Sequence, residues 1–305
     1  MTCKVFGIGE VLWDFLPDGR KLGGAPANFA YHARALGADG CLISRVGDDA
    51  LGKEILETLE KLGVSIAGIA VDPTYPTGTV SVELTSDGQP CFTIHEGVAW
   101  DHLQLDPSLM SSIAEADALC FGTLAQRGEP ARSTIRQLVA HSPETAVRVF
   151  DVNLRQDFYS RDVLNASSEL ANVVKLNDAE LPIVARLLEL RGSPREQMKA
   201  LLDQYELRLV ACTCGAQGSI LFNGAEWCDI PGLPAKVVDT VGAGDSFTAA
   251  ITLGMLAGWN IEKLGRVANE IAAYVCSRAG GTPPLPPNLR TYFEESRPAT
   301  SSPER

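Results

Sequence analysis

The sequence predicts an α/β fold in which helices cover both faces of a mostly parallel central sheet. Short apolar segments alternate with amphipathic helical patterns along most of the chain, and this alternation is typical of parallel sheets. The apolar segments are short, as expected of strands buried between two helix layers. With 305 residues, 45% of them hydrophobic and 21% charged, the chain can bury a substantial core.

The elements follow in order from this alternation. The predicted strands are short apolar runs at residues 4–8, 41–46, 118–121, 147–151, 173–176 and 208–212. Helical periodicity predicts the intervening helices at residues 27–36, 52–62, 131–141, 180–190, 196–205 and 246–256. In sheets of this kind, ligands bind at the carboxyl ends of the strands.

One region breaks the alternation. Residues 79–84 alternate apolar and polar side chains, a turn signal follows, and residues 91–95 return as a second strand. No helix is available to cover this hairpin, so we expect a small β flap, built from about residues 10–22 and 70–98, that lies outside the main sheet. An edge hairpin of the main sheet is the open alternative. A flap over the carboxyl ends would exclude water from a site there.

The C-terminal region is predicted to lose regular structure at the proline-rich residues 283–287. Residues 296–305 are polar, contain two prolines and show no apolar periodicity, which predicts a disordered tail. The sequence therefore predicts a single α/β domain over residues 1–295.

Charge and composition exclude several classes of function. The net charge of −12 argues against a nucleic-acid partner, which needs clustered Lys and Arg. No run approaches the roughly 20 apolar residues of a membrane span, and the first residues lack the apolar core of a signal peptide. The eight Cys include no Cys-x-x-Cys pair, so we expect free thiols in a reducing cytosol. These observations predict a soluble cytoplasmic protein without a membrane partner.

The densest signal is a glycine turn at residues 242–244, which leads into the predicted helix 246–256. Val237 and Val238, just before it, are interpreted as the end of a strand. Unpaired amides at the mouth of a helix can hold a phosphate. Asp245 stands inside this anion-holding turn, an odd position for a carboxylate that does no chemistry. An ordinary N-cap Asp is the alternative.

A second glycine signal lies near the N-terminus. Gly23 and Gly24 precede Pro26, and Asn28 follows at the mouth of a predicted helix. Paired glycines let a ligand approach the backbone, and Asn28 could hydrogen-bond hydroxyls or serve as a buried capping amide. Residues 47–53 have the spacing of a phosphate-binding loop, but Glu54 replaces the required Ser or Thr. We therefore reject this loop as a nucleotide site.

The chain resembles the PfkB (ribokinase-like) carbohydrate kinases over nearly its whole length. Residues 239–245, DTVGAGD, match the family's Asp-Thr-x-Gly-Ala-Gly-Asp motif, and residues 47–52 look like its Gly-x-Asp-x-x-Gly segment. Residues 23–28, GGAPAN, and residues 151–155, DVNLR, are similar to the fructokinase versions of two further motifs. The resemblance implies a ribokinase-like three-layer sandwich with a small β lid.

The resemblance also implies roles for individual residues. Asp245 would be the catalytic base and would contact the sugar, while the backbone of Gly242, Ala243 and Gly244 would hold the transferring phosphoryl group. The sugar hydroxyls would be bound by five residues, namely Asp14, Gly23, Gly24, Asn28 and Arg155.

Further residues would bind the nucleotide and ions. Asn177 and Glu180 match the family's Asn-x-x-Glu, with Glu180 reaching Mg²⁺ through water; an ordinary helix start is the alternative. The nucleotide would also meet Thr213, Gly215 and Gly218 in a turn that could equally be a plain hairpin, together with Asn269. A monovalent cation such as K⁺ would lie near Asp239 and Thr240.

The implied activity is transfer of the γ-phosphoryl group of ATP to the primary hydroxyl of a furanose-like sugar, with fructose favoured. Residues 95–101 depart from the Arg-containing flap segment of many fructokinases, which leaves ribose, a nucleoside or a keto-deoxy sugar acid open as acceptor. A catalytically silent sugar-binding regulator is the alternative of another class. The resemblance further implies a homodimer joined through the lids.

Overall fold

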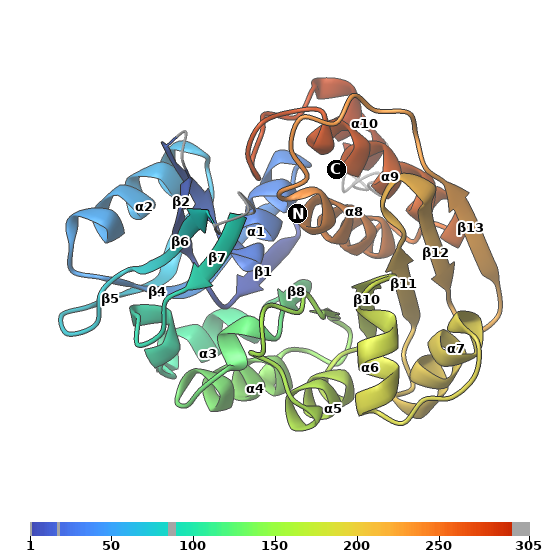
Figure 1. Cartoon of the computed structure of the whole chain (residues 1–305), viewed down its shortest axis with the longest axis horizontal. Coiled ribbons are helices and arrows are strands. Elements are labelled where there is room, and N and C mark those ends of the chain that lie inside the picture. The colour runs from blue at the N-terminus through green and yellow to red at the C-terminus, as the bar shows by residue number, and fades with distance from the viewer. Residues whose placement is uncertain (1, 17–18, 85–89, 295–305) are drawn as a thin grey trace, which may run out of the picture.

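The computed structural model describes residues 2–16, 19–84 and 90–294, and its main feature is a nine-stranded sheet (Figure 1). The strand order is β13-β12-β11-β10-β9-β8-β1-β4-β5. Seven strands pair in parallel, namely β1 (Lys4–Ile8), β4 (Asp39–Gly47), β5 (Ser65–Asp72), β8 (Ala118–Phe121), β9 (Val147–Asp151), β10 (Val173–Asn177) and β11 (Leu209–Thr213). At one edge, β12 (Gly218–Phe222) and β13 (Trp227–Pro231) are antiparallel. The predicted mostly parallel sheet is confirmed.

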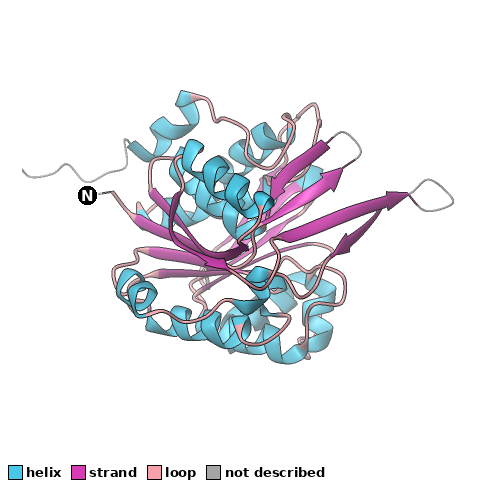
Figure 2. Ribbon diagram, turned by 90° about the vertical axis from the view of Figure 1, so that its left-hand side faces the viewer, coloured by secondary structure: helices cyan, strands magenta, loops and turns pink. Residues whose placement is uncertain are grey.

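Helices cover both faces of this sheet, and Figure 2 shows the two layers. One layer contains α1 (Ala25–Ala35), α8 (Ala243–Leu256), α9 (Ile261–Cys276) and α10 (Pro287–Glu294), while α2 (Ala50–Lys61) covers β4 and β5. The other layer contains α3 (Pro107–Ile113), α4 (Ala131–His141), α5 (Arg161–Leu170), α6 (Leu181–Leu187) and α7 (Pro194–Gln204). Three short 3₁₀ turns are η1 (Ala99–His102), η2 (Leu124–Gln126) and η3 (Gly215–Gln217).

Two of the three apolar clusters in the described chain lie on opposite faces of the sheet, and the third lies between α1, α2, β4 and the flap. On one side Phe121 and Phe150 stack with ring centroids 5.5 Å apart, and on the other Phe29 and Phe247 are buried. Helix α8 is buried along residues 246–254, as expected of a helix that is apolar on all sides. This burial fixes the start of α8 relative to the sheet. Within the described part of the chain, no helix is both long and apolar enough to cross a membrane.

A second sheet forms the flap. Its order is β3-β2-β6-β7, with β2 (Leu12–Leu16), β3 (Gly19–Gly23), β6 (Gly78–Leu84) and β7 (Pro90–Ile94). Asp14 pairs with Lys21 and Val80, so these side chains share one face. On the opposite face Trp13 Nε1 donates to the Leu51 carbonyl of α2 at 3.1 Å. The alternative of an edge hairpin on the main sheet is wrong, because the hairpin pairs with β2 instead.

Two local predictions are also wrong. Val237 and Val238 lie in a coil, 61% and 59% exposed, because no core is available to bury their side chains. Regular structure does not end in the proline-rich segment, because Pro287 begins α10, where Leu289 and Phe293 are buried one turn apart. Proline is tolerated in the first turn of a helix. The predicted turn at 86–88 and the predicted tail at 296–305 lie outside the described residues.

Residues 47–53, rejected as a nucleotide site, form a clasp between α2 and the flap. Asp49 caps α2 by accepting a hydrogen bond from the Gly52 amide at 2.7 Å. The same carboxylate accepts bonds from the Thr77 amide at 2.8 Å and the Thr77 hydroxyl at 2.7 Å. Thr77 immediately precedes β6, so Asp49 ties the flap to the main body.

We predict that Asp49→Ala lowers the free energy of unfolding by about 2 kcal/mol, because a helix cap and two charge-assisted hydrogen bonds are lost. Urea unfolding measures this change. Asp48→Ala is the matched control: Asp48 is exposed and lies 3.7 Å from Lys53, so its removal should cost less than about 0.5 kcal/mol. Equal effects of the two substitutions would contradict the clasp.

Candidate active site

Polar side chains gather at the carboxyl ends of the parallel strands. Glu10 follows β1, Asp151 ends β9, Asn177 ends β10 and Thr213 ends β11. The strand order changes direction between β1 and β8. From β1 the chain first adds β4 and β5 on one side, and it then adds β8 to β13 in order on the other side. Ligand sites of doubly wound sheets lie at such a point. Asp245, at the start of α8, is close enough to Asp151 for their charges to interact.

The late glycine turn is tightly packed against neighbouring backbone. Gly242 has φ +77°, and a Cβ there would lie 2.3 Å from the carbonyl oxygen of Gly281, so only glycine fits. A Cβ on Gly244 would lie 2.9 Å from Lys175 Nζ. The amides of Gly244 and Asp245 are in the first turn of α8, where helix N–H groups have no intrahelical acceptor. These groups can hold an anion.

One hydrogen bond joins the two helices that follow the glycine-rich segments of the sequence. Asn28 Nδ2 donates to Asp245 Oδ2 at 2.8 Å across 217 residues of chain. Helices α1 and α8 pack against each other, which brings their first turns together. Gly24 precedes α1 with φ +107°, and a Cβ there would lie 2.5 Å from the Glu10 carbonyl oxygen. Asn28 Oδ1 is buried without a partner among the described residues, so it can accept a bond from a ligand.

Burial controls the charge of Asp245. Burial, and then the neighbouring Asp151, raise its pKa to about 6, while the Asn28 hydrogen bond, Lys175 and Arg155 act in the opposite direction. Burial is the largest of these effects, and it favours the protonated form. A pKa near 6 still leaves the carboxylate predominantly ionised at pH 7, and basic enough to accept a proton.

The flap brings further predicted sugar-binding residues to the same place. Burial raises the pKa of Asp14 to about 6, and the charges of Arg155 and Lys21 oppose that rise. A Cβ on Gly23 would lie 2.4 Å from Asp14 Oδ2. Arg155 also acts electrostatically on Asp245. Asp14, Gly23, Arg155 and Asp245 therefore form one electrostatic neighbourhood between flap and sheet.

Glu180 joins the ends of β9 and β10. Its carboxylate is 5% exposed and accepts bonds from the Leu154 and Asn177 amides, both at 2.8 Å. Asn177 Oδ1 in turn accepts from the Glu180 amide at 2.8 Å. Within the described ranges, no group of three or more His, Cys, Asp or Glu could hold a metal. Each Glu180 oxygen accepts one backbone bond and keeps a lone pair, so it can accept a hydrogen bond from a water molecule on Mg²⁺.

The predicted nucleotide turn and Asn269 lie against the same strand. Gly218 has φ +99°, and a Cβ there would lie 2.0 Å from the Ile230 carbonyl oxygen of β13. Asn269 of α9 donates from Nδ2 to that carbonyl at 3.3 Å. The η3 turn, which begins at Gly215, follows Thr213 at the end of β11 after one residue, Cys214. Thr213, Gly215, Gly218 and Asn269 are thus brought together at the antiparallel edge of the sheet.

The predicted monovalent-cation residues contact the flap. Asp239 Oδ2 accepts a bond from the Gly280 amide at 2.9 Å and lies 3.5 Å from Lys21 Nζ. Asp239 Oδ1 accepts from the Val241 amide at 3.0 Å, and the Thr240 carbonyl accepts from the Ala243 amide at 3.4 Å. In this structure a lysine ammonium from β3 therefore lies beside the carboxylate expected to bind a cation.

Sequence reasoning missed two buried charged residues of this site. Glu10 is 3% exposed, and its Oε2 has no partner among the described residues, while Oε1 accepts from the Ala25 amide at 3.3 Å. Burial raises the pKa of Glu10 to about 7. Lys175 is 5% exposed within β10. The only signal for either residue was a lone charge inside an apolar run, which also fits a surface position.

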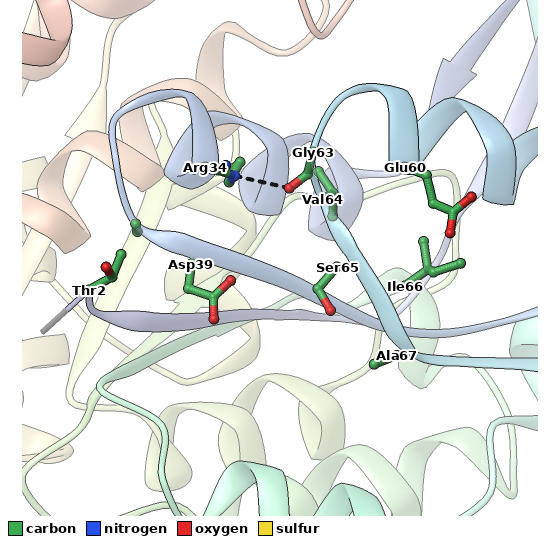
Figure 3. A pocket seen from close by; sticks show the side chains of 10 residues that line it. Thr2, Arg34, Asp39, Glu60, Gly63, Val64, Ser65, Ile66 and Ala67 are labelled. Atoms are coloured by element: carbon green, nitrogen blue, oxygen red, sulfur yellow. Dashed lines mark hydrogen bonds between the residues drawn. The ribbon is translucent and has the colours of Figure 1, made fainter.

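A separate hollow of about 790 Å³ opens at the amino ends of the strands, away from the candidate site (Figure 3). Thr2, Asp39 and Ser65, which line it, lie at the amino ends of β1, β4 and β5. In the close-up, Arg34 Nε donates to the Gly63 carbonyl at 3.0 Å above these strands. The chemistry-bearing residues described above are at the other ends of the strands, so this hollow is not the candidate site.

We predict that Glu10→Gln stabilises the protein in a pH-dependent way. Folded Glu10 holds its proton up to about pH 7, whereas the unfolded chain releases it near pH 4.5. The folded state therefore loses stability as the pH rises from 4.5 to about 7. Above pH 7 the whole free-energy cost of burying the ionised Glu10 is present. The variant should be more stable than the parent by up to about 3 kcal/mol at pH 8, and the gap should narrow toward pH 5.

Urea unfolding at both pH values measures the effect of Glu10→Gln. Glu144→Gln serves as the control, because Glu144 is exposed. A Glu10→Gln effect that is the same at pH 5 and pH 8 would show that Glu10 does not titrate in this window.

Comparison with known proteins places the chain in a family. The model for "pfkB family carbohydrate kinase" matches residues 19–288. A fructokinase of Klebsiella pneumoniae is 31% identical, covering 92% of this chain and 94% of its own; one of Escherichia coli is 32% identical, covering 84% and 85%. The crystal structure of an uncharacterized sugar kinase from Pyrococcus horikoshii in complex with ATP has TM-score 0.77 and 30% identity, covering 92% and 94%. The chain therefore belongs to the pfkB family of carbohydrate kinases.

Proposed function

We propose that this carbohydrate kinase transfers the γ-phosphoryl group of ATP to the primary hydroxyl of a furanose-like sugar, with fructose as the favoured acceptor. The observation that carries the proposal is Asp245, a partly buried carboxylate held by Asn28 at 2.8 Å beside the unpaired amides of α8. The relatives named fructokinase support fructose, and the ATP complex of the Pyrococcus horikoshii sugar kinase supports ATP.

The residues of the site can perform this transfer by positioning and charge stabilisation. Asn28 orients the Asp245 carboxylate, which accepts the proton of the sugar hydroxyl as the new O–P bond forms. The backbone of the turn Gly242, Ala243 and Gly244 holds the moving phosphoryl group, and the amides of Gly244 and Asp245 stabilise its negative charge. Asp14 of the flap and Arg155, which follows β9, would hold the sugar so that its hydroxyl faces this turn.

The nucleotide and its ion would lie on the other side of the turn. Mg²⁺ bound with ATP supplies charge neutralisation of the phosphates. We expect Asn177 and Glu180 to hold it through water. Each Glu180 oxygen accepts one backbone bond and keeps a further lone pair for a water molecule, which supports this role. The turn with Thr213, Gly215 and Gly218 would support the nucleotide, with Asn269 near its base.

A keto-deoxy sugar acid is the second candidate acceptor. Lys21 and Arg155 both act electrostatically on Asp14, so two cations border the sugar-binding residues. A carboxylate of the acceptor could pair with either cation.

The pairing of Asp245 with an anion-holding turn argues against a catalytically silent regulator. A protein that only binds sugar has no use for such a pairing.

The homodimer joined through the flaps and the cytoplasmic location remain predictions. Phe15 and Phe92 on the flap are 41% and 51% exposed. Exposed aromatic side chains of this kind are enriched at interfaces between protein chains, which supports the flap as the dimer contact.

A panel of acceptors tests the proposed function. ADP release is measured with ATP, Mg²⁺ and fructose, ribose, a nucleoside or a keto-deoxy sugar acid. We expect the highest kcat/KM with fructose, and measurable turnover only where a primary hydroxyl is available. A higher value for the sugar acid would replace fructose while leaving the kinase assignment intact. No ADP release with any acceptor would contradict the kinase proposal.

We predict that Asp245→Asn lowers kcat by roughly a hundredfold or more, because the base can no longer accept a proton. The amide keeps the shape of the site, so sugar binding measured by calorimetry should persist. Asp203→Asn is the control, since Asp203 is exposed on α7 and pairs there with Lys199. Near-normal turnover of the Asp245 variant would remove this residue from its proposed role.

A further inference from the structure

Lys175 is a buried cation directly beneath the glycine turn. It lies in β10 between the apolar residues Val174 and Leu176, and its Nζ donates to Asp151 Oδ1 at 3.1 Å. An unpaired ammonium in such a position would be strongly unfavourable. Its charged neighbours come from several elements, namely Asp151 of β9, Glu180 before α6 and Asp245 of α8; the thiol of Cys120 in β8 also faces it.

Asp151 is held from two sides, and this fixes the ammonium in place. Thr248 of α8 donates its hydroxyl to Asp151 Oδ2 at 2.8 Å, and the same hydroxyl lies 2.9 Å from the Gly244 carbonyl. Asp151 is 3% exposed. The Lys175–Asp151 pair is therefore attached through Thr248 to α8, the helix whose first turn carries Asp245.

The ammonium lies close to the turn at Gly244. A Cβ on Gly244 would lie 2.9 Å from Lys175 Nζ, closer than such contacts ordinarily allow. Glycine at this position therefore leaves room for the lysine ammonium. A lysine that only filled the core would not need to approach the turn so closely.

The position of Lys175 matches a requirement of the chemistry. During transfer, negative charge on the phosphoryl group adds to the charges already present on Asp245 and Asp151. Buried like charges repel strongly unless a cation lies nearby. Lys175 is a cation in contact with Asp151 and close to Asp245, and its charge favours the ionised form of Asp245 by lowering the pKa of that carboxyl.

We propose that Lys175 is a positioning residue of the kinase reaction, whose ammonium, clamped by Asp151, offsets the negative charge that gathers between Asp245 and the Gly242–Gly244 turn. This inference rests on the proposed function, because it concerns the same transfer step.

The test compares two variants that both lack the Asp151 charge. Asp151→Asn keeps the ammonium and offers it an isosteric acceptor; Asp151→Asn/Lys175→Met also removes the ammonium and leaves no unpaired charge at the pair. The difference between them therefore reports the ammonium alone. The wild type and both variants are compared by thermal unfolding and by the pH dependence of kcat/KM with the acceptor that the wild type uses best.

Without the ammonium, Asp245 loses a favourable cation and must titrate at higher pH. We expect the acidic limb of kcat/KM to lie about one pH unit higher in the double variant than in Asp151→Asn. We also expect the double variant to have a kcat at least about tenfold lower than that of Asp151→Asn. The KM for the sugar should differ between the two variants by less than about threefold.

A limb at the same pH in both folded variants, with kcat within threefold, would overturn the role of Lys175 while leaving the kinase assignment standing. A double variant that differs from Asp151→Asn only by a lower unfolding temperature would also overturn the role of Lys175, since this is the result expected of a lysine with a purely structural role. A wild type that phosphorylates no sugar would overturn the proposed function and this inference with it.

Discussion

The hydrogen bond from Asn28 to Asp245 is the contact on which the site depends. It joins the first turns of α1 and α8 at 2.8 Å, and both helices are fixed by apolar packing on one face of the sheet. Because α8 is buried along most of its length, the position of Asp245 is set by the core and not by a mobile loop. The strands supply the remaining polar groups at their carboxyl ends, so a parallel sheet and two helix starts are sufficient to assemble the site.

The site carries an electrostatic strain that suits its proposed chemistry. Burial raises the pKa values of Glu10, Asp14 and Asp245, so three acids are held where their charged forms are disfavoured. Opposing cations come from three separate elements: Lys175 from β10, Arg155 after β9 and Lys21 from the flap. The flap therefore contributes charge as well as cover, through its contact between Lys21 and Asp239. Function and stability pull in opposite directions here, as is common at active sites.

The sequence was most informative where one physical signal dominated. Residues 118–121 and 147–151 were predicted as strands with the observed bounds, because apolar runs of that length have few alternatives. The glycine turns were found because a positive φ and close backbone contacts leave only glycine, as Gly242 shows. Lys175 was missed because its burial depends on Asp151 and Thr248, whose proximity only the tertiary fold creates. The failure at Val237 and Val238 has the same origin, since β-branched residues form a strand only where a neighbouring strand is available.

The central claim, that the Gly242–Gly244 turn holds the migrating phosphoryl group beside Asp245, is tested most directly by a crystal structure with a non-hydrolysable ATP analogue and the accepted sugar. The account predicts the terminal phosphate within hydrogen-bonding distance of the turn amides, and the sugar's primary hydroxyl within about 3 Å of the Asp245 carboxylate. A terminal phosphate bound away from that turn would contradict it.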